Sequence, residues 1–345
     1  MAGSKGTIIL TGANGSLGSA IVSKIVSTPE FAAYHGIYIV RDAESTPNLS
    51  YALRTSRAAH LHSNDVLSLD LTDLARVREI AATINARVAA GDAAPIRALI
   101  LNAGWQEFTS QTWTEDGFDV AFAANYLGHW LLTMLLLQSM DRESGKVVVI
   151  GSLSHDPQKR QNISGGQFKD PKWKVIFRDG IEPVAKGTWS TTKDDPSWCA
   201  GFRRYAASKL CELMMIGELQ RRLDIDPNLN KVSVIGVDPG SMATDLVRRG
   251  PWVMRMVHFK IMYLCASLTV WLWPNGFLRT TRKSAGDVLA ASFDPNPNKG
   301  LYFNGSARAE MSAEARDPEK QLLLWKETLK YTQFKAGESV LTHWS

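Results

Sequence analysis

The stretch TGANGSLGSA, residues 11–20, directly follows the apolar run KGTIIL at residues 5–10. Its glycines lie at Gly12, Gly15 and Gly18. A turn that points backbone N–H groups at a pyrophosphate has no room for bulky side chains, and the N-terminus of the following helix favours negative charge. The stretch therefore predicts a strand, a glycine turn and a helix that together bind a dinucleotide.

The rest of the chain alternates apolar runs typical of strands with stretches of helical periodicity. We expect strands within 6–12, 36–40, 65–73, 96–104, 145–152, 231–240 and 300–304, and helices over 17–27, 74–91, 118–140 and 204–222. Strands that alternate with helices indicate right-handed βαβ units around a parallel sheet. No linker separates two halves, so we predict the α/β class: a Rossmann-type doubly wound parallel sheet in one domain over residues 1–345.

Composition excludes several classes of protein. A hydrophobic fraction of 45% and a charged fraction of 21% are ordinary for a soluble α/β protein. The net charge is +5, but no dense Lys/Arg cluster is interleaved with aromatics, so we expect no nucleic-acid partner. The cysteines lack metal-ligand spacing, and their odd, low count suits a reducing compartment. The first strand also begins too early for a preceding secretory signal, so we expect no metal and a cytoplasmic location.

The end of the second predicted strand carries the signal for cofactor choice. It reads YIVRDAE, residues 38–44. An acidic side chain there would accept a hydrogen bond from the ribose 2′-hydroxyl of NAD, whereas a guanidinium suits the 2′-phosphate of NADP. Arg41 favours NADP, and Asp42, one residue later, leaves NAD as the alternative.

The stretch YAASK contains a candidate acid–base pair. Tyr205 and Lys209 are four residues apart and so share one face of a helix. A free tyrosine has a pKa of about 10, and a neighbouring ammonium lowers it. The pair alone is also compatible with an ordinary surface contact. Ser152, which ends the strand 145–152, supplies a hydroxyl that could hold a substrate carbonyl beside Tyr205.

Three polar residues near these motifs have alternative roles. Asn125 lies within an apolar helix and needs hydrogen-bond partners, either a water that leads to Lys209 or backbone groups at a helix kink. Ser154 is a rival to Ser152, but it lies further from the strand. His129 is most simply interpreted as a packed histidine.

Taken together, the motifs resemble the short-chain dehydrogenase/reductase superfamily over most of residues 6–310. TGANGSLG, NAG, FAANYLGHW, the serine after the strand, YAASK and DPGSMATDL occur in the family's order. The resemblance implies a catalytic set of Asn125, Ser152, Tyr205 and Lys209. In the family the tyrosine is the general acid/base and the lysine binds the nicotinamide ribose and lowers the tyrosine pKa. The serine steadies the substrate oxygen, and the asparagine maintains a proton-relay water.

The resemblance also implies the residues that line the cofactor. These are Gly12, Asn14, Gly15, Ser16, Leu17, Gly18, Arg41, Asp70, Leu71, Asn102, Ala103, Gly104, Tyr205, Lys209, Pro239, Gly240 and Thr244. More narrowly, residues 113–133 and 312–330 are similar to the retinol-dehydrogenase-like branch, whose members mostly use NADP(H) on lipophilic alcohols, ketones or aldehydes. The chain also resembles fungal reductases that act on terpenoids and polyketides.

Two features depart from the family pattern. The glycine turn reads TGxxGxxG rather than TGxxxGxG, a form commoner in the extended, epimerase-like group, with Ser16 in the usual place of the middle glycine. Ser152 and Tyr205 are also much further apart than usual, which predicts an insertion over 156–203. The insertion either covers the substrate pocket, with an aromatic wall from Trp173, Trp189 and Trp198, or forms a solvent-facing excursion anchored by these tryptophans.

The segment 251–280 is unusually apolar. Its uncharged core from Ile261 to Trp273 is shorter than the ~20 residues that span a bilayer. Cationic or titratable side chains flank it, namely Arg255, His258, Lys260 and Arg279. An apolar lid over the substrate, an interfacial helix that dips into a membrane, and a dimer contact are all compatible with this pattern.

These observations predict an NADP(H)-dependent oxidoreductase of secondary metabolism. It would interconvert a lipophilic ketone or aldehyde with its alcohol, on a terpenoid, steroid or polyketide-like substrate, with Tyr205 as general acid/base. The alternatives are an epimerase or dehydratase of the extended group and a non-catalytic NADP-binding regulator. Expected partners are a small lipophilic substrate, a second copy of the chain, and an intracellular membrane touched peripherally through 251–280.

Overall fold

A computed structural model describes residues 4–54, 62–244, 246, 250 and 263–345. It confirms the predicted α/β class. Eight strands form one sheet in the order β3-β2-β1-β4-β5-β6-β7-β8, in which all neighbours are parallel except the last pair. The strands are β1 (Thr7–Thr11), β2 (His35–Val40), β3 (Asn64–Ser68), β4 (Ile96–Leu101), β5 (Lys146–Ile150), β6 (Ser233–Asp238), β7 (Tyr302–Asn304) and β8 (Ala307–Ala309).

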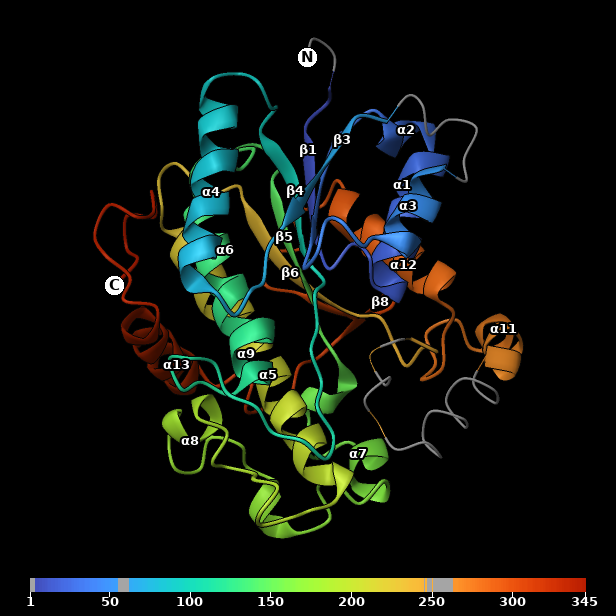
Figure 1. Cartoon of the computed structure of the whole chain (residues 1–345), viewed down its shortest axis with the longest axis vertical. Coiled ribbons are helices and arrows are strands. Elements are labelled where there is room, and N and C mark those ends of the chain that lie inside the picture. Colours follow the sequence, from blue (N-terminus) through green and yellow to red (C-terminus); the bar gives the residue numbers. More distant parts are fainter. Residues whose placement is uncertain (1–3, 55–61, 245, 247–249, 251–262) are drawn as a thin grey trace.

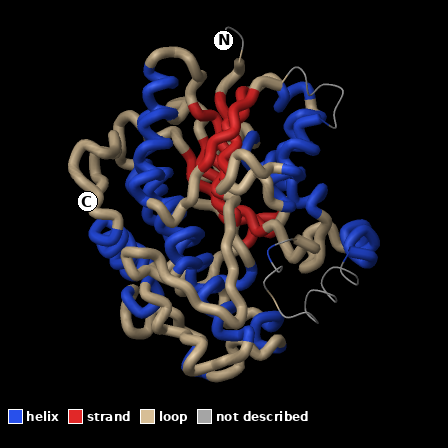
Figure 2. Tube along the Cα trace, viewed as in Figure 1, coloured by secondary structure: helices blue, strands red, loops and turns tan. Residues whose placement is uncertain are grey.

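Helices cover both faces of this sheet (Figure 1). One face carries α4 (Leu74–Ala89), α5 (Val120–Phe122), α6 (Gly128–Leu136), α9 (Trp198–Asp224) and α13 (Pro318–Tyr331). The other carries α1 (Ser16–Ser27), α3 (Pro47–Arg54) and α12 (Thr281–Phe293), and the short α2 (Pro29–Ala32) follows α1. Figure 2 shows the sheet as a single layer between the helices, which is the doubly wound Rossmann architecture.

Alternation of apolar side chains along the strands builds the two cores. Ile9 and Val147 pack with α4, α6 and α9, whereas Leu10 and Val148 pack with α1 and α12. Successive residues of a strand point to opposite faces, so strands that are apolar at every position are buried on both sides. Because β1, β2, β4, β5 and β6 are parallel, their carboxyl ends meet at one edge of the sheet. Ligands bind at this edge in such sheets.

The helix predicted over 118–140 is interrupted. It consists of α5, a π-helical turn at Ala123–Leu127, α6 and a final 3₁₀ turn at Leu137–Ser139. The run Val120–Ser139 is long and apolar enough to cross a membrane, but 89% of its apolar stretch of 18 residues is buried inside the fold. It is therefore the central core helix of this domain.

Several boundaries and elements differ from expectation. The third strand ends at Ser68, so Asp70 lies in the following turn. The helix predicted over 204–222 begins earlier, at Trp198, where the Ser197 side chain caps it by accepting a hydrogen bond from the Cys199 N–H. The helices α3, α12 and α13 and the antiparallel strand β8 were not predicted.

The segment 156–203 folds back against the body of the protein. It contains α7 (Arg160–Ser164) and α8 (Glu182–Ala185), and its apolar residues around α8 join the core beneath α9. Arg203, which is 2% exposed, donates to Asp195 at 2.6 Å and lies 4.2 Å from the ring centroid of Trp173. Trp173 in turn packs edge-on against Trp189. These contacts hold the segment as ordered structure.

The segment 251–280 is described only from residue 263 onward, so the flanking residues Arg255, His258 and Lys260 lie outside the described part. Within it, α11 (Tyr263–Leu272) lies at the edge of the molecule, apart from the helices that cover the sheet (Figure 1). Arg279, which flanks the apolar segment in the sequence, does not face solvent. Its guanidinium is buried and donates to the Asp238 carbonyl oxygen at 2.8 Å, which ties this segment to the end of β6.

Candidate active site

The glycine turn after β1 leaves no room for side chains at Gly12 and Gly18. Gly12 has φ +67°, and a Cβ there would lie 2.7 Å from the Ala103 Cα atom. A Cβ on Gly18 would lie 2.2 Å from the Gly12 carbonyl oxygen. Helix α1 starts directly after Gly15 without a side-chain cap or an acidic first turn. Its N-terminal N–H groups thus fit the phosphates of a dinucleotide.

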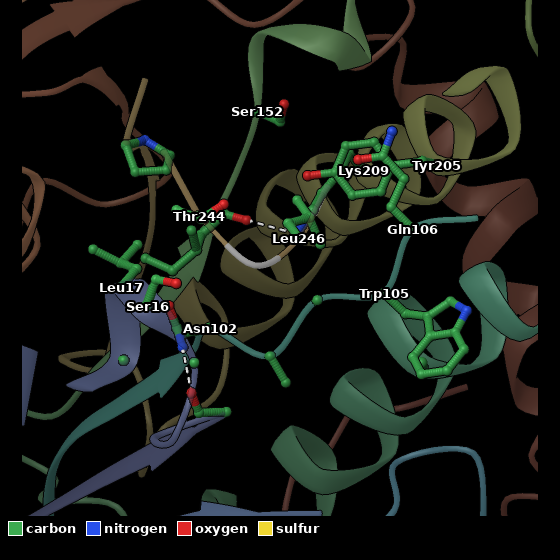
Figure 3. Close-up of a pocket in the computed structure, with 18 of the residues that line it drawn as sticks. Ser16, Leu17, Asn102, Trp105, Gln106, Ser152, Tyr205, Lys209, Thr244 and Leu246 are labelled. Atoms are coloured by element: carbon green, nitrogen blue, oxygen red, sulfur yellow. Dashed lines mark hydrogen bonds between the residues drawn. The ribbon is translucent and has the colours of Figure 1, made fainter. Parts of the chain in front are cut away.

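One cavity of about 1320 Å³ opens at this edge of the sheet. It brings together the predicted site residues of the glycine turn, of β2, of the loops after β3, β4, β5 and β6, and of α9, with the exception of Asn125. Figure 3 shows part of this arrangement, with Ser16, Leu17 and Asn102 beside the glycine turn and Ser152, Tyr205 and Lys209 further along. Residues more than 190 positions apart in the chain thus share one site.

At the end of β2, Arg41 is exposed and its guanidinium carbon lies 4.9 Å from the centroid of the Trp105 ring. In the described part of the chain, Arg41 has no carboxylate partner in an ion pair. The Asp42 carboxylate accepts a hydrogen bond from the Glu44 N–H, 2.9 Å away. Arg41 is thus the cation at this end of the cavity that could take an anionic group of a ligand.

Two predicted cofactor residues also organise the loops around the cavity. Asn14 accepts hydrogen bonds from the N–H groups of Asn48 and Leu49, both at 3.0 Å, so its side chain anchors the start of α3. The Asn102 side chain donates to the Thr11 carbonyl oxygen at 2.8 Å. These contacts fasten the glycine turn to α3 and the end of β1 to the loop after β4.

Tyr205 and Lys209 lie on α9 with both side chains buried. Lys209 Nζ is 5.9 Å from the centroid of the Tyr205 ring. Burial raises the pKa of Tyr205 above its usual value, while the Lys209 charge and a hydrogen bond with Ser152 act against this rise. The predicted lowering by Lys209 is thus present, but burial outweighs it in the protein without cofactor.

Ser152 follows β5 and begins a 3₁₀ turn, Leu153–His155. Its hydroxyl oxygen accepts hydrogen bonds from the Ser154 N–H at 3.2 Å and the Ser154 hydroxyl at 2.9 Å. His155 donates from Nδ1 to the Ser152 carbonyl oxygen, because its Nε2 accepts from the Ser312 N–H. Ser154 and His155 therefore hold Ser152 in place, and its hydroxyl hydrogen is directed to Tyr205, beside which a substrate oxygen would bind.

Asn125 does not line the cavity. Its amide nitrogen donates to the Trp105 carbonyl at 2.9 Å and to the Ser208 hydroxyl at 2.8 Å, and its side-chain oxygen accepts from the Trp105 N–H at 2.6 Å. These contacts fit the bracing role considered from the sequence, and the proton-relay water stays a prediction. The side chain joins the π-helical turn to α9 and to the loop after β4.

The sequence did not single out several residues of the site. Glu212, one turn after Lys209, pairs with it at 2.7 Å, and nothing in the motif YAASK indicates this contact. Trp105, Gln106, Phe108 and Phe202 line the cavity as well. Of the three predicted wall tryptophans, Trp198 lines it, whereas Trp173 and Trp189 pack against each other.

Known proteins resemble the chain in sequence and in fold. The family described as short chain dehydrogenase matches residues 6–162. The short-chain dehydrogenase iccH of Talaromyces variabilis is 45% identical, with 99% of each chain covered. Polyprenol dehydrogenase of Mus musculus is 28% identical over 97% of this chain and 86% of its own.

Among solved structures, NADPH-bound carbonyl reductase from chicken fatty liver has the same fold, with a TM-score of 0.57, 14% identity, and coverage of 89% of this chain and 99% of its own. Full-length similarity to a fungal short-chain dehydrogenase, together with the sheet order and the cavity, gives one conclusion: this chain is an oxidoreductase of the short-chain dehydrogenase/reductase family.

Proposed function

We propose that the protein uses NADP(H) to interconvert a lipophilic ketone or aldehyde with its alcohol. The observation that carries this proposal is the convergence of Tyr205, Lys209 and Ser152 on the same cavity as the glycine turn. A nicotinamide cofactor, when bound, supplies or accepts the hydride. The glycine turn with Gly12 and Gly18 would hold its phosphates.

The chain's own residues would handle the proton and the oxygen. The Tyr205 hydroxyl donates its proton to the carbonyl oxygen of the substrate, and the Ser152 hydroxyl hydrogen-bonds the same oxygen. The Lys209 ammonium stabilises the phenolate that Tyr205 becomes. In the reverse direction the phenolate accepts the proton of the alcohol.

The walls of the cavity support a lipophilic substrate. Trp198, Phe202 and Tyr205 follow one another along α9, with ring centroids 6.0 Å and 6.5 Å apart. Phe108 and Phe277 add apolar surface to the same cavity. Such walls bind a hydrophobic body, while Ser152 and Tyr205 orient its polar end.

The direct test is NADPH consumption by the purified protein with a panel of carbonyl compounds. The panel pairs bulky lipophilic ketones and aldehydes, such as benzil, with small ones, such as acetone. We expect turnover of bulky compounds and little or none of the small ones. Tight NADPH binding without consumption across the panel would contradict an oxidoreductase role on such substrates and favour the epimerase alternative.

The preference for NADP(H) depends on Arg41. Replacing Arg41 by Ala removes a charge-assisted contact to the 2′-phosphate, which is worth about 1.5–3 kcal/mol. We therefore expect the KM for NADPH to rise about 10- to 100-fold, with little change for NADH. Steady-state kinetics with both cofactors measure this, with the exposed Arg76→Ala on α4 as the control. If KM rose equally for NADPH and NADH, Arg41 would not be the residue that binds the 2′-phosphate.

The exposed apolar face around α11 supports the proposed membrane contact. Trp271 is 77%, Trp273 64% and Leu268 61% exposed, and Phe277, a few residues later in the chain, lines the cavity. We expect the protein to cosediment with vesicles that contain anionic lipid, and the triple variant Trp271→Ser, Leu272→Ser, Trp273→Ser to bind several-fold less. Trp113→Ser, at an exposed tryptophan elsewhere, is the matched control. If the unchanged chain does not bind vesicles but forms a dimer through this face, the membrane contact is refuted. The alternative, a contact with a second copy of the chain, is then supported.

A further inference from the structure

A buried ion pair lies beside Tyr205 on α9. Lys209 Nζ is 2.7 Å from Glu212 Oε2 and 3.0 Å from the Ile150 carbonyl oxygen. The two side chains are only 4% and 1% exposed. An ammonium has three hydrogens, and the Ile150 carbonyl oxygen accepts one of them, while Lys209 itself lines the cavity. The carboxylate, 2.7 Å from Nζ, holds the ammonium in place beside that cavity.

His129 on α6 approaches the same carboxylate. Its Nε2 lies 2.9 Å from the Thr11 hydroxyl oxygen. A carbonyl oxygen only accepts, so His129 Nδ1 donates to the Asn125 carbonyl, 2.7 Å away, and it lies 3.4 Å from Glu212 Oε1. Lys209, at 2.7 Å, is therefore the nearer cation for Glu212.

The groups that face the Lys209 ammonium are Glu212 and Tyr205 from its own helix and Asp238 from the end of β6. Burial lowers the pKa of Lys209, but Glu212, Tyr205 and Asp238 together outweigh burial, with Glu212 the largest of the three, and hold that pKa above its ordinary value. For Tyr205, burial raises the pKa, Lys209 lowers it, and Glu212 and Asp238 raise it further. Glu212 therefore keeps Lys209 charged and also weakens its pull on the tyrosine proton.

We propose that Glu212 is a positioning residue for Lys209 and that its charge sets the pH range over which Tyr205 keeps its proton. This inference rests on the proposed role of Tyr205 as the proton donor. A site that holds the phenol protonated to higher pH is suited to reduce carbonyls near neutral pH. Oxidation of the alcohol by the same site then requires a more alkaline medium.

The test compares pH profiles of kcat/KM for Glu212→Gln and the unchanged chain. Benzil with NADPH serves as the probe for reduction, and benzoin with NADP⁺ for oxidation. The variant removes one negative charge from the buried group formed by Tyr205, Lys209 and Glu212. As the pH rises, this group therefore loses its first proton at a lower pH, whether that proton comes from Tyr205 or from Lys209. We expect the alkaline limb of the reduction profile and the rising, acidic limb of the oxidation profile both to move to lower pH by about one unit or more.

Glu218→Gln is the matched control. Glu218 is buried on the same helix and pairs with Arg222 at 2.7 Å, outside the cavity. The control should leave the limb in place. A limb that does not move in Glu212→Gln, that moves to higher pH, or that moves equally in Glu218→Gln would overturn the proposal.

A second readout needs no substrate. The phenolate absorbance of Tyr205, taken as the difference between each protein and its Tyr205→Phe counterpart, should develop at lower pH in Glu212→Gln than in the unchanged chain. This titration separates the inference from the proposed function. Activity that survives Tyr205→Phe refutes the proton-donor role, whereas an unshifted titration refutes the role of Glu212.

Glu212→Asp separates charge from position and remains informative if Glu212→Gln does not fold. Aspartate keeps the negative charge but has a shorter reach toward Lys209. We expect the limb to stay near its original pH while kcat falls several-fold, because the ammonium is less well placed. A Glu212→Asp variant with unchanged kcat and KM would refute the positioning role.

Discussion

Replacing Tyr205 by Phe is expected to lower kcat for carbonyl reduction about 10²- to 10⁴-fold, the range that a positioned acid contributes. The substitution removes the hydroxyl and keeps the ring, which is 7% exposed and lies 6.5 Å from the Phe202 ring centroid. The packing of α9 and the glycine turn should persist. NADPH affinity, measured by its fluorescence, should therefore stay close to that of the unchanged chain.

Tyr126→Phe is the control for this prediction. Tyr126 is also buried, but its hydroxyl bonds Thr328 at 2.7 Å and it does not line the cavity. Its loss should cost about 1 kcal/mol of stability, as for an ordinary hydrogen bond, and leave kcat nearly unchanged. If both variants lost activity equally, Tyr205 would be a packing residue rather than the proton donor.

The second large effect is expected on stability. Lys209→Met leaves the Glu212 carboxylate buried without a countercharge. Breaking a buried pair in this way typically costs about 3–5 kcal/mol. Urea unfolding of the cofactor-free protein near neutral pH measures this loss.

The double variant Lys209→Met, Glu212→Leu distinguishes an unpaired charge from a packing defect. Removing both partners at once eliminates the uncompensated charge, so most of the lost stability should return. Activity should not return, because Tyr205 still lacks the ammonium. A double variant as unstable as Lys209→Met alone would show that the loss came from packing.

The parts of the site that depend on local sequence could be predicted. The glycine turn after β1 requires small residues at fixed spacing, because a Cβ at Gly12 or Gly18 would collide with backbone atoms. The Tyr205–Lys209 spacing places both side chains on one helix face, and helix geometry guarantees this regardless of the rest of the fold. Such features follow from a few consecutive residues.

Contacts between distant elements could not be predicted. The Asn125 side chain donates hydrogen bonds to the Trp105 carbonyl and the Ser208 hydroxyl. These bonds depend on how the π-helical turn packs against α9. The pairing of Glu212 with Lys209 likewise depends on the burial of this part of α9, since on an exposed helix the same spacing forms a weak surface pair. The spacing of two residues on a helix predicts that their side chains are neighbours, but it does not predict whether they are buried.

The burial of Arg279 could not be predicted from its neighbours in the sequence. An arginine beside an apolar segment is ordinarily a surface residue, and its burial here follows from carbonyl oxygens that converge on it from the end of β6 and from Asn275 and Gly276. The tryptophans of segment 156–203 illustrate the same limit. Their composition indicates an aromatic cluster, but only the folded contacts separate Trp198, at the cavity, from Trp173 and Trp189.

The most direct test of the central claim follows the hydride itself. Purified protein is incubated with NADPH deuterated at the transferable position and with the lipophilic carbonyl panel, and the products are analysed by mass spectrometry. Our account predicts an alcohol that carries deuterium on the former carbonyl carbon, formed by the unchanged chain and lost in Tyr205→Phe. Bound NADPH that delivers no deuterium to any compound in the panel would contradict it.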